Sequence, residues 1–383
     1  MSQIQYIDTP EQLADFCESI KQVPWLAIDT EFQREKTYRS ILALIQIATP
    51  ELVAIIDPLA CDIKPLLNIL YDENILKVFH AARQDQEIFY DWCGKPLSPV
   101  FDSQIAAPII GLPEQAGYGR LVEEVLGVQL SKAHSRTDWI RRPLSQDQIT
   151  YAADDVIYLA QLYPLMKQQL IDKDRLEWIA PAFAKLCKSS LYANPPELAW
   201  KRMRAAKRLK GASLSSLQKM AEWREALAQT KNIPRGWLIK DEMLIEIAKL
   251  KPNDTKVLSS IRGVSEKFID KYGDIIINIV TNASEQKPVA QEKPAKIKKA
   301  SEKDEALADL LMAQVRLKSQ LSDINPSSVA TRKELIQLIH GERNIPLLTD
   351  WRKDIVGLDL VKTLEGKNNF IVAAGELIIE TSS

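Results

Sequence analysis

The stretch WLAIDTEF, at residues 25–32, constrains the fold more than any other part of this sequence. Its apolar residues have the pattern of a buried strand, and the strand ends in two carboxylates, Asp29 and Glu31. Side chains at positions i and i+2 of a strand face the same way, so the two carboxylates would repel each other. A divalent cation is the usual means of keeping both ionised, although most acidic pairs of this spacing are simply solvated.

A second segment, KVFHAARQD at residues 77–85, has the pattern of a short strand that runs into a helix. The helix would continue to Trp92, which places Asp85 near its first turns. The N-terminal end of a helix favours a carboxylate for electrostatic reasons alone, so Asp85 can also be interpreted as a stabilising surface charge.

The third segment begins with LSQDQI, at residues 144–149, which has the features of a helix start. Ser145 is the expected N-cap and Gln148 completes a capping box, while Leu144 and Ile149 form a hydrophobic staple.

In the helix that follows, Tyr151 and Asp155 are four residues apart and therefore share a face. Taken alone, such a pair is more simply a tyrosine at the edge of the core beside an exposed aspartate. The functional interpretation depends on all three segments occurring together and in this order.

Together, the three segments resemble the DEDD superfamily of 3′-to-5′ exonucleases. The sequence YAADD at residues 151–155 matches the Tyr-x-x-x-Asp motif of the tyrosine subclass. IDTEF at 28–32, LIQI at 44–47 and RTDWIRRPLS at 136–145 are similar to the ribonuclease D family within that superfamily. The resemblance covers residues 20–170.

The resemblance implies a catalytic site with two divalent metal ions. It implies that Asp29 bridges the two ions and that Glu31 and Asp155 complete the ligands of the ion that activates water. Asp85 would hold the second ion through water, and Tyr151 would orient the attacking water, since a tyrosine that titrates near about 10 is a poor base at neutral pH. Mg²⁺ or Mn²⁺ is expected, because hard cations prefer carboxylate oxygen and two such ions stabilise both the entering and the leaving oxygen.

The charge of the chain is unevenly distributed, although its net charge is only −1. Residues 185–219 contain nine basic residues and one acidic residue, Glu197. Such a segment can neutralise phosphates, and a solvated helix face with snorkelling lysines is the alternative. The residues that we expect to bind nucleic acid, in this segment and beside the active-site helix, are Lys201, Arg202, Arg204, Arg136, Arg141 and Arg142.

Length and composition fit a soluble enzyme of two or three domains, because 383 residues exceed one ordinary core. The polar N-terminus predicts no signal peptide, and no apolar run approaches the roughly 18 residues of a membrane span. The scattered cysteines argue against zinc and against a disulfide framework, and they favour the cytoplasm. They are Cys17, Cys61, Cys93 and Cys187.

The order of patterns predicts a mixed α/β layer. The strand-like runs are at 25–32, 42–48, 53–57 and 77–80, and the helices are at about 81–92, 103–110, 118–126 and 146–170. The runs on either side of Thr49-Pro50-Glu51 are expected to form an antiparallel hairpin. The resemblance implies that this layer is a ribonuclease-H-like exonuclease domain.

From about residue 210 the pattern is helical and contains a weak repeat. Pro234 and Pro326 are each followed eight positions later by a glutamate, Glu242 and Glu334, and an apolar stretch. The first copy resembles the HRDC domain, and the second matches it by position, which implies two all-α HRDC-type domains. The expected boundaries are 1–170 for the exonuclease domain, 171–209 for a basic connector, 210–282 for the first HRDC domain, 283–301 for a basic linker and 302–380 for the second.

The resemblance implies a metal-dependent 3′-to-5′ exoribonuclease that releases nucleoside 5′-monophosphates from RNA with a free 3′ end. The family's usual substrate is the 3′ trailer of precursor transfer RNA. No G-x-x-x-x-G-K-[ST] loop is present, so ATP is not an expected partner, and a monomer is expected. Two alternatives stay open: a DNA exonuclease of the same superfamily would share the five site residues, and a non-catalytic RNA-binding scaffold would be expected to lack at least one of them.

Overall fold

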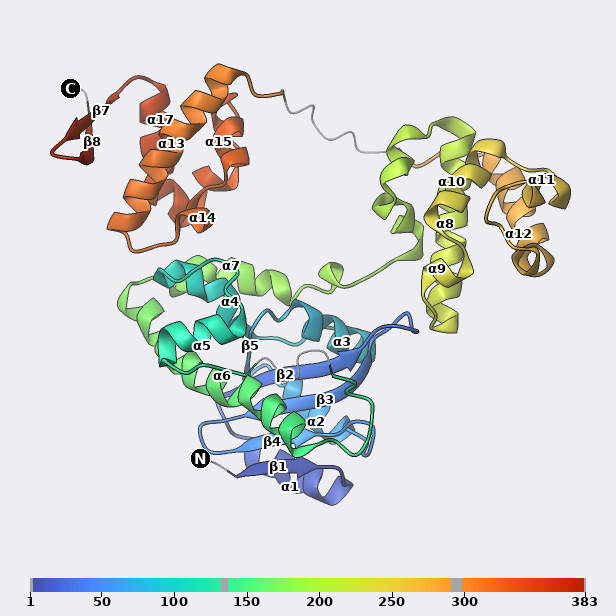
Figure 1. Cartoon of the computed structure of the whole chain (residues 1–383), viewed down its shortest axis with the longest axis horizontal. Helices are drawn as coiled ribbons and strands as arrows, with labels where there is room; N and C mark the ends of the chain where they lie inside the picture. The colour runs from blue at the N-terminus through green and yellow to red at the C-terminus, as the bar shows by residue number, and fades with distance from the viewer. Residues whose placement is uncertain (1–2, 132–136, 291–297, 382–383) are drawn as a thin grey trace. The chain divides into compact units, whose positions relative to one another are not determined.

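The computed structural model describes residues 3–131, 137–290 and 298–381 (Figure 1). The chain divides into two compact units, each of which combines segments that are distant in the sequence. Unit 1 comprises Met1–Glu31, Ala43–Lys188 and Ala295–Ser383, and unit 2 comprises Phe32–Leu42 and Ser189–Pro294.

A six-stranded mixed sheet forms the centre of unit 1, with the strand order β1-β4-β3-β2-β5-β6. The pairs β1–β4, β2–β5 and β5–β6 are parallel. β3 and β4 pair antiparallel with Ile45 opposite Ile56, which confirms the predicted hairpin. The strands are β1 (Ile4–Ile7), β2 (Trp25–Gln33), β3 (Ile41–Ala48), β4 (Val53–Ile56), β5 (Leu76–Phe79) and β6 (Val100–Asp102).

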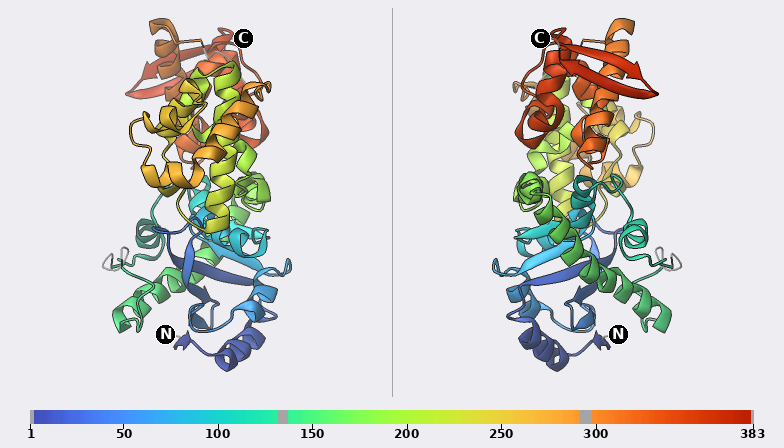
Figure 2. Two further views of the ribbon diagram at one scale, coloured as in Figure 1. Left: turned by 90° about the vertical axis from the view of Figure 1, so that its right-hand side faces the viewer. Right: turned by 90° about the vertical axis from the view of Figure 1, so that its left-hand side faces the viewer.

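Helices flank this sheet, and the long helix α6 runs across one of its faces (Figure 2). The predicted capping box is present: Ser145 Oγ accepts from the Gln148 backbone N–H at 3.2 Å, and Gln148 Oε1 accepts from the Ser145 N–H at 2.9 Å. The helices of this part are α1 (Pro10–Ile20), α2 (Lys64–Leu70), α3 (Arg83–Cys93), α4 (Ser103–Ala106), η1 (Ala107–Ile110), α5 (Tyr118–Leu126), α6 (Gln146–Asp172) and α7 (Leu176–Leu186).

The C-terminal part of unit 1 is helical up to residue 364 and then forms a β-hairpin. The hairpin corrects the prediction that the chain is helical to its end, and its physical cause is the turn at Ala374 and Gly375, both of which have positive φ. The elements are α13 (Glu302–Leu321), α14 (Pro326–Val329), α15 (Arg332–Ile339), η5 (Pro346–Leu348), α16 (Asp350–Arg352), η6 (Lys353–Gly357), α17 (Leu358–Leu364), β7 (Asn368–Ala373) and β8 (Glu376–Thr381).

Within unit 1, this C-terminal part packs against α7 and the residues just before it. The Arg175 guanidinium donates to the backbone oxygens of Ile109 at 2.8 Å and Asp323 at 3.0 Å. The rings of Trp178 and Trp351 stack with their centroids 4.9 Å apart. A buried arginine with carbonyl acceptors on both sides holds the two segments together, because unpaired donors there would be costly.

Unit 2 is built around the long helix α8, which packs against η3, α10 and α12. Its core contains Leu217, Met220, Leu244, Ile247 and Ile276. Among the residues that the structure describes, no helix combines the length and apolar composition that crossing a membrane requires. The elements are η2 (Ser189–Leu191), η3 (Pro196–Arg202), η4 (Arg204–Arg208), α8 (Gly211–Lys231), α9 (Arg235–Leu238), α10 (Asp241–Leu250), α11 (Thr255–Ser259) and α12 (Glu266–Ser284).

The weak sequence repeat corresponds to a repeated order of helices. The helices α8, α9 and α10 are a long helix, a four-residue helix and a third helix, and α13, α14 and α15 follow the same order. Glu242 and Glu334 each lie in the first turn of the third helix.

Candidate metal centre

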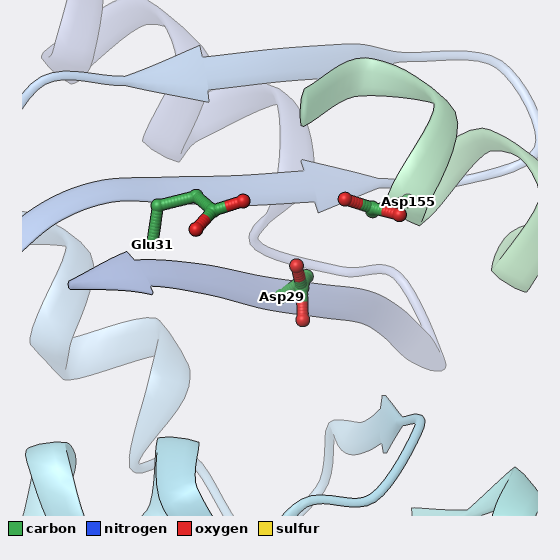
Figure 3. A group of neighbouring side chains, drawn as sticks. All are labelled: Asp29, Glu31 and Asp155. Atoms are coloured by element: carbon green, nitrogen blue, oxygen red, sulfur yellow. The ribbon is translucent and has the colours of Figure 1, made fainter. Parts of the chain in front are cut away.

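Three of the predicted carboxylates converge at the end of β2. Asp29 and Glu31 extend from β2, and Asp155 reaches them from α6 (Figure 3). One oxygen from each of the three carboxylates lies within 4.8 Å of the others. The sequence separates Asp29 from Asp155 widely, so the fold itself creates this cluster.

The local sequence explains why Asp155 points to the sheet. Ala152, Val156 and Leu159 are buried on the face of α6 that packs on the sheet. Asp155 lies next to this apolar stripe, so packing of the stripe carries its carboxylate to the strand. Asp29 and Glu31 have the alternating positions that place them on one face of β2, as predicted.

Burial, and secondarily neighbouring negative charges, raise the pKa values of the three clustered carboxyl groups. Burial, followed by the charges of Asp29, Asp155 and Asp85, raises the pKa of Glu31 to about 9. Burial, and then the charge of Asp154, raises the pKa of Asp155 to about 7. Burial and the nearby Asp155 raise the pKa of Asp29 well above its ordinary value. A site of this kind binds either protons or a cation at neutral pH.

The donor atoms fit a hard divalent cation. Among the residues that the structure describes, the cluster offers carboxylate oxygens and no histidine or cysteine ligand. Carboxylate oxygens are the ligands that Mg²⁺ and Mn²⁺ prefer. Asp29, Glu31 and Asp155 are therefore the residues that would hold such an ion.

Asp85 lies outside this three-carboxylate cluster but is linked to its strand. It is buried in the first turn of α3, and Thr30 Oγ1 donates to Asp85 Oδ1 at 2.5 Å. Burial, and then the charge of Asp29, raises the pKa of Asp85 well above its ordinary value. The alternative interpretation of Asp85 as an exposed surface charge is wrong, because the side chain is only 6% exposed.

Tyr151 lies one helical turn before Asp155 and is partly buried, with its ring centroid 6.1 Å from that of Trp139. Burial, followed by the charges of Asp155, Glu31 and Asp29, raises the pKa of Tyr151 above its ordinary value. Its hydroxyl is therefore protonated at neutral pH, which suits a group that orients water and does not suit a general base.

Sequence reasoning missed Tyr118 in this region. Tyr118 Oη donates to the backbone oxygen of Asp154 at 3.0 Å, one residue before Asp155. Burial, followed by the charges of Asp155 and Asp29, raises the pKa of Tyr118 well above its ordinary value. A tyrosine at the start of α5 gives no sign in the sequence that it will contact α6.

The structure assigns the predicted nucleic-acid-binding arginines near α6 to different environments. Arg136 lies outside the described residues, and Arg141 is exposed. The prediction for Arg142 is corrected, because its guanidinium donates to the buried Asp57 at 2.5 and 2.9 Å. Its other N–H groups donate to the backbone oxygens of Ala43, Trp139 and Arg141. No N–H group of Arg142 is left for a phosphate.

The three predicted nucleic-acid-binding residues of unit 2 also differ from one another. Lys201 and Arg204 are exposed at the surface of that unit. Arg202 forms an ion pair with Glu225, with its Nη2 atom 2.8 Å from a carboxylate oxygen. Arg235 pairs with the same carboxylate at 3.4 Å, so Glu225 offsets only part of the positive charge of Arg202.

We expect a divalent cation to stabilise the fold more strongly as pH rises. The carboxyl groups of Asp155 and Glu31 have pKa values of about 7 and about 9 in the fold and near about 4 in an unfolded chain. Because folding raises the pKa of both carboxyl groups, their protonation stabilises the folded state. This stabilisation is complete at a pH below the pKa values of the unfolded chain, and it is lost as the pH rises through the pKa values of the folded chain. A bound cation offsets that loss, so the difference in Tm between Mg²⁺ and EDTA should be larger at pH 9 than at pH 6.

Thermal unfolding at the two pH values measures this difference, with Glu31→Gln as the matched control. The variant lacks one of the two titrating groups, so the difference in Tm between Mg²⁺ and EDTA should increase less between pH 6 and pH 9. A difference in Tm that does not change with pH in the unmodified chain would contradict cation binding by these carboxylates.

The comparisons with known proteins agree with this geometry. The 3′-5′ exonuclease family matches residues 4–171, and the HRDC domain family matches residues 213–280. Ribonuclease D of Sphingobium indicum is 41% identical over 97% of this chain and 97% of that protein. Ribonuclease D of Zymomonas mobilis is 39% identical over 95% of this chain and 95% of that protein.

A solved structure extends the similarity to the fold. The crystal structure of Escherichia coli RNase D, described as an exoribonuclease involved in structured RNA processing, matches with a TM-score of 0.77 and 29% identity. The match covers 95% of this chain and 99% of that one. It confirms the predicted ribonuclease-H-like exonuclease domain followed by a helical HRDC region.

Proposed function

Because this chain belongs to the ribonuclease D family and is a 3′-to-5′ exoribonuclease, we propose that it hydrolyses RNA 3′ ends to nucleoside 5′-monophosphates. The observation that carries the proposal is the convergence of Asp29, Glu31 and Asp155 within 4.8 Å. Such a cluster is costly to bury without a cation, and the exonuclease family match includes all three residues.

We propose that two divalent ions, Mg²⁺ or Mn²⁺, bind at this centre. Asp29, Glu31 and Asp155 would hold one ion, and Asp85 together with Asp29 would hold the second. When bound, these ions would activate a water molecule and stabilise charge on the entering and the leaving oxygen. The protein itself supplies the protonated hydroxyl of Tyr151, which can direct the attacking water, and the buried bond from Thr30 that orients Asp85.

The count of bound ions tests this assignment. Mn²⁺ titration calorimetry should find two sites per chain, and Asp85→Asn should remove one of them because it replaces a charged ligand by a neutral amide. Asp91→Asn, a change of the same kind on the same helix, is the control and should retain both sites. One site in the unmodified chain would contradict the two-ion proposal.

The proposed physiological substrate is precursor transfer RNA with a 3′ trailer. The family relation and the structured-RNA description of the Escherichia coli enzyme support it. The exposed Arg141, Lys201 and Arg204 are the proposed phosphate contacts. Incubation of a precursor bearing a 3′ trailer should yield shortened RNA and 5′-mononucleotides, identified by mass spectrometry. Release of nucleoside 3′-monophosphates would contradict the proposed hydrolysis.

The domain boundaries stay part of the proposal: exonuclease 1–170, connector 171–209, HRDC 210–282, linker 283–301 and second HRDC-like domain 302–380. A monomer in the cytoplasm that acts without ATP is the proposed form of the enzyme. A non-catalytic scaffold is less well supported, because Asp29, Glu31, Asp85 and Asp155 are all present together with Tyr151.

A further inference from the structure

Unit 2 contains a pocket of about 410 Å³ beside the start of α10. The residues that line it lie in or next to η3, α8, α9 and the first turn of α10, and all of them belong to that unit. Four of these lining residues are basic: Arg202, Arg224, Arg235 and Lys240. Guanidinium and ammonium groups that converge on one space are typical of sites that bind phosphate.

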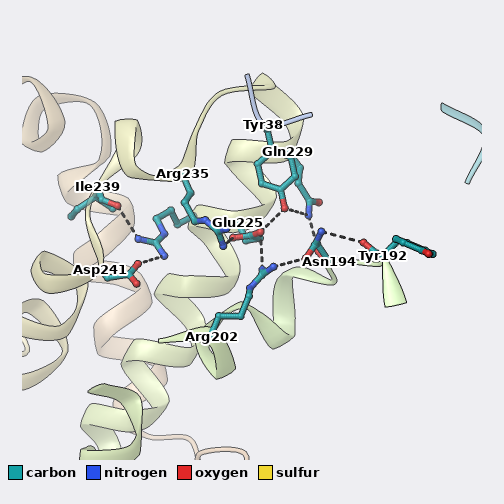
Figure 4. Close-up of polar contacts among 10 residues, drawn as sticks. Tyr38, Tyr192, Asn194, Arg202, Glu225, Gln229, Arg235, Ile239 and Asp241 are labelled. Carbon is teal, nitrogen blue, oxygen red and sulfur yellow. Dashed lines mark hydrogen bonds and ion pairs between the residues drawn. The ribbon is translucent and has the colours of Figure 1, made fainter. Parts of the chain in front are cut away.

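Two of the basic residues share a single acidic partner. Glu225 is fully buried, and it forms ion pairs with Arg202 at 2.8 Å and Arg235 at 3.4 Å (Figure 4). Its Oε1 atom also accepts from Tyr38 Oη at 2.5 Å, which belongs to the same unit. One carboxylate balances only one of two guanidinium charges. The two arginine side chains are 39% and 43% exposed, so N–H groups that Glu225 does not use are open to a ligand.

The acidic residue that begins α10 has a basic partner of its own. Arg224 Nη2 donates to Asp241 Oδ1 at 2.7 Å, and Arg224 Nη1 donates to the backbone oxygen of Ile239 at 2.9 Å. The Arg224 side chain is only 2% exposed, and its Nε–H has no hydrogen-bond partner among the residues that the structure describes. A buried donor without an acceptor is costly, and Arg224 lines the pocket. The missing acceptor is one that a bound anion can supply.

The start of α10 adds further positive charge. Lys240 is the N-cap residue, and no side chain caps this helix. The first backbone N–H groups of a helix have no acceptor within it, and an anion is stabilised there. The Lys240 side chain is exposed and has no polar partner in the described part of the chain. Glu242, the other acidic residue of the lining, is exposed, so water screens its charge.

We propose that this pocket binds a phosphate group, which Arg202, Arg235 and Lys240 hold at the start of α10. The phosphate can come from two sources: a phosphodiester of an RNA strand, or a free nucleoside 5′-monophosphate. The exposed Lys201 and Arg204 flank Arg202 in the sequence and continue the positive charge, which favours the RNA strand. The inference goes beyond the proposed function, because it concerns binding without metal and includes no hydrolytic step.

Lys240→Gln tests the proposal in the full chain, because it removes one charge from an exposed side chain. All measurements are made in EDTA, which keeps the carboxylate centre free of metal and the RNA intact. Calorimetry measures the binding of inorganic phosphate and of adenosine 5′-monophosphate, and fluorescence anisotropy measures the binding of a single-stranded RNA.

The two sources predict different results. If an RNA strand supplies the phosphate, the RNA dissociation constant should rise about 10-fold in Lys240→Gln, as expected for one lost charged hydrogen bond. The slope of the logarithm of RNA affinity against the logarithm of salt concentration should fall by about 0.7. If a mononucleotide is the ligand, affinity for adenosine 5′-monophosphate should fall instead and RNA affinity should stay the same.

Lys256→Gln is the matched control. It removes the same charge from an exposed lysine of α11, in the same unit, that does not line the pocket. All three affinities should equal those of the unmodified chain. Arg235→Gln is the second test variant, because Glu225 then keeps Arg202 and Tyr38 as partners. It should weaken binding of the same ligand as Lys240→Gln does.

Unchanged affinities for phosphate, adenosine 5′-monophosphate and RNA in both Lys240→Gln and Arg235→Gln would overturn the inference. Circular dichroism establishes that each variant is folded at the assay temperature. A loss of RNA affinity in Lys256→Gln equal to that in Lys240→Gln would also overturn it, because binding would then depend on overall charge. Hydrolysis is measured separately with metal present, so a failure of the proposed function is distinguishable from a failure of this inference.

Discussion

Asp155→Asn is expected to reduce RNA hydrolysis by about 10³-fold or more, because it removes charge from the centre where the reacting oxygens must be stabilised. The asparagine side chain is nearly isosteric with aspartate, so the packing of α6 should be preserved. RNA affinity should stay within about three-fold, because contacts to phosphate are spread over many basic residues. Single-turnover cleavage and fluorescence anisotropy in EDTA measure the two quantities separately.

Asp154→Asn is the matched control for this prediction. It makes the same change one residue earlier on α6, and Asp154 does not belong to the three-carboxylate cluster. Its backbone oxygen, which accepts the Tyr118 bond, is unaffected by the substitution. Equal loss of binding and cleavage in Asp155→Asn would contradict the division between a catalytic cluster and a dispersed binding surface.

Arg142→Met is expected to destabilise the fold by about 3 kcal/mol or more, since removing one partner of a buried ion pair leaves the other charge uncompensated. Asp57 is only 2% exposed, and Arg142 supplies two of its hydrogen bonds. Burial acts to raise the pKa of Asp57, but hydrogen bonds from Arg142 and Tyr6 outweigh it and hold the pKa below its ordinary value. The ionised carboxylate therefore stabilises the folded state at a pH above the pKa of an aspartate in the unfolded chain, about 3.9. This stabilisation is lost as the pH falls through the pKa of Asp57 in the folded chain.

Urea unfolding at neutral pH measures the loss, and Arg120→Met is its control. Arg120 and Glu124 form an exposed pair four residues apart on α5, with 2.9 Å between Nε and Oε1. Such pairs contribute about 0.3–0.5 kcal/mol. A loss in Arg142→Met no larger than that in Arg120→Met would show that the buried pair adds little to stability.

Local signals predicted much of the exonuclease fold. The capping box of Ser145 and Gln148 and the hairpin of β3 and β4 depend on residues that are neighbours in the sequence, and both are present. The strand β1 was missed because four residues at the edge of a sheet give little periodicity. The hairpin after residue 367 was missed although its turn at Ala374 and Gly375 was a readable signal.

The candidate site was predictable only through the family resemblance. Nothing in the local pattern brings Asp155 to Asp29, and without the motif order each carboxylate could have been a solvated surface charge. Contacts between distant residues explain the remaining errors. Arg142 pairs with Asp57 across 85 positions, and no local pattern distinguishes such an arginine from one that binds phosphate.

The alternative of a DNA exonuclease is resolved by the same experiment that tests the central claim. A 5′-labelled single-stranded RNA and its DNA counterpart are incubated with Mg²⁺, Mn²⁺ or EDTA, and the products are separated by length. We predict an RNA ladder that shortens from the 3′ end, requires the metal and is absent in Asp29→Ala, with little degradation of DNA. An unshortened RNA under every condition, or a ladder that persists in Asp29→Ala, would contradict the account.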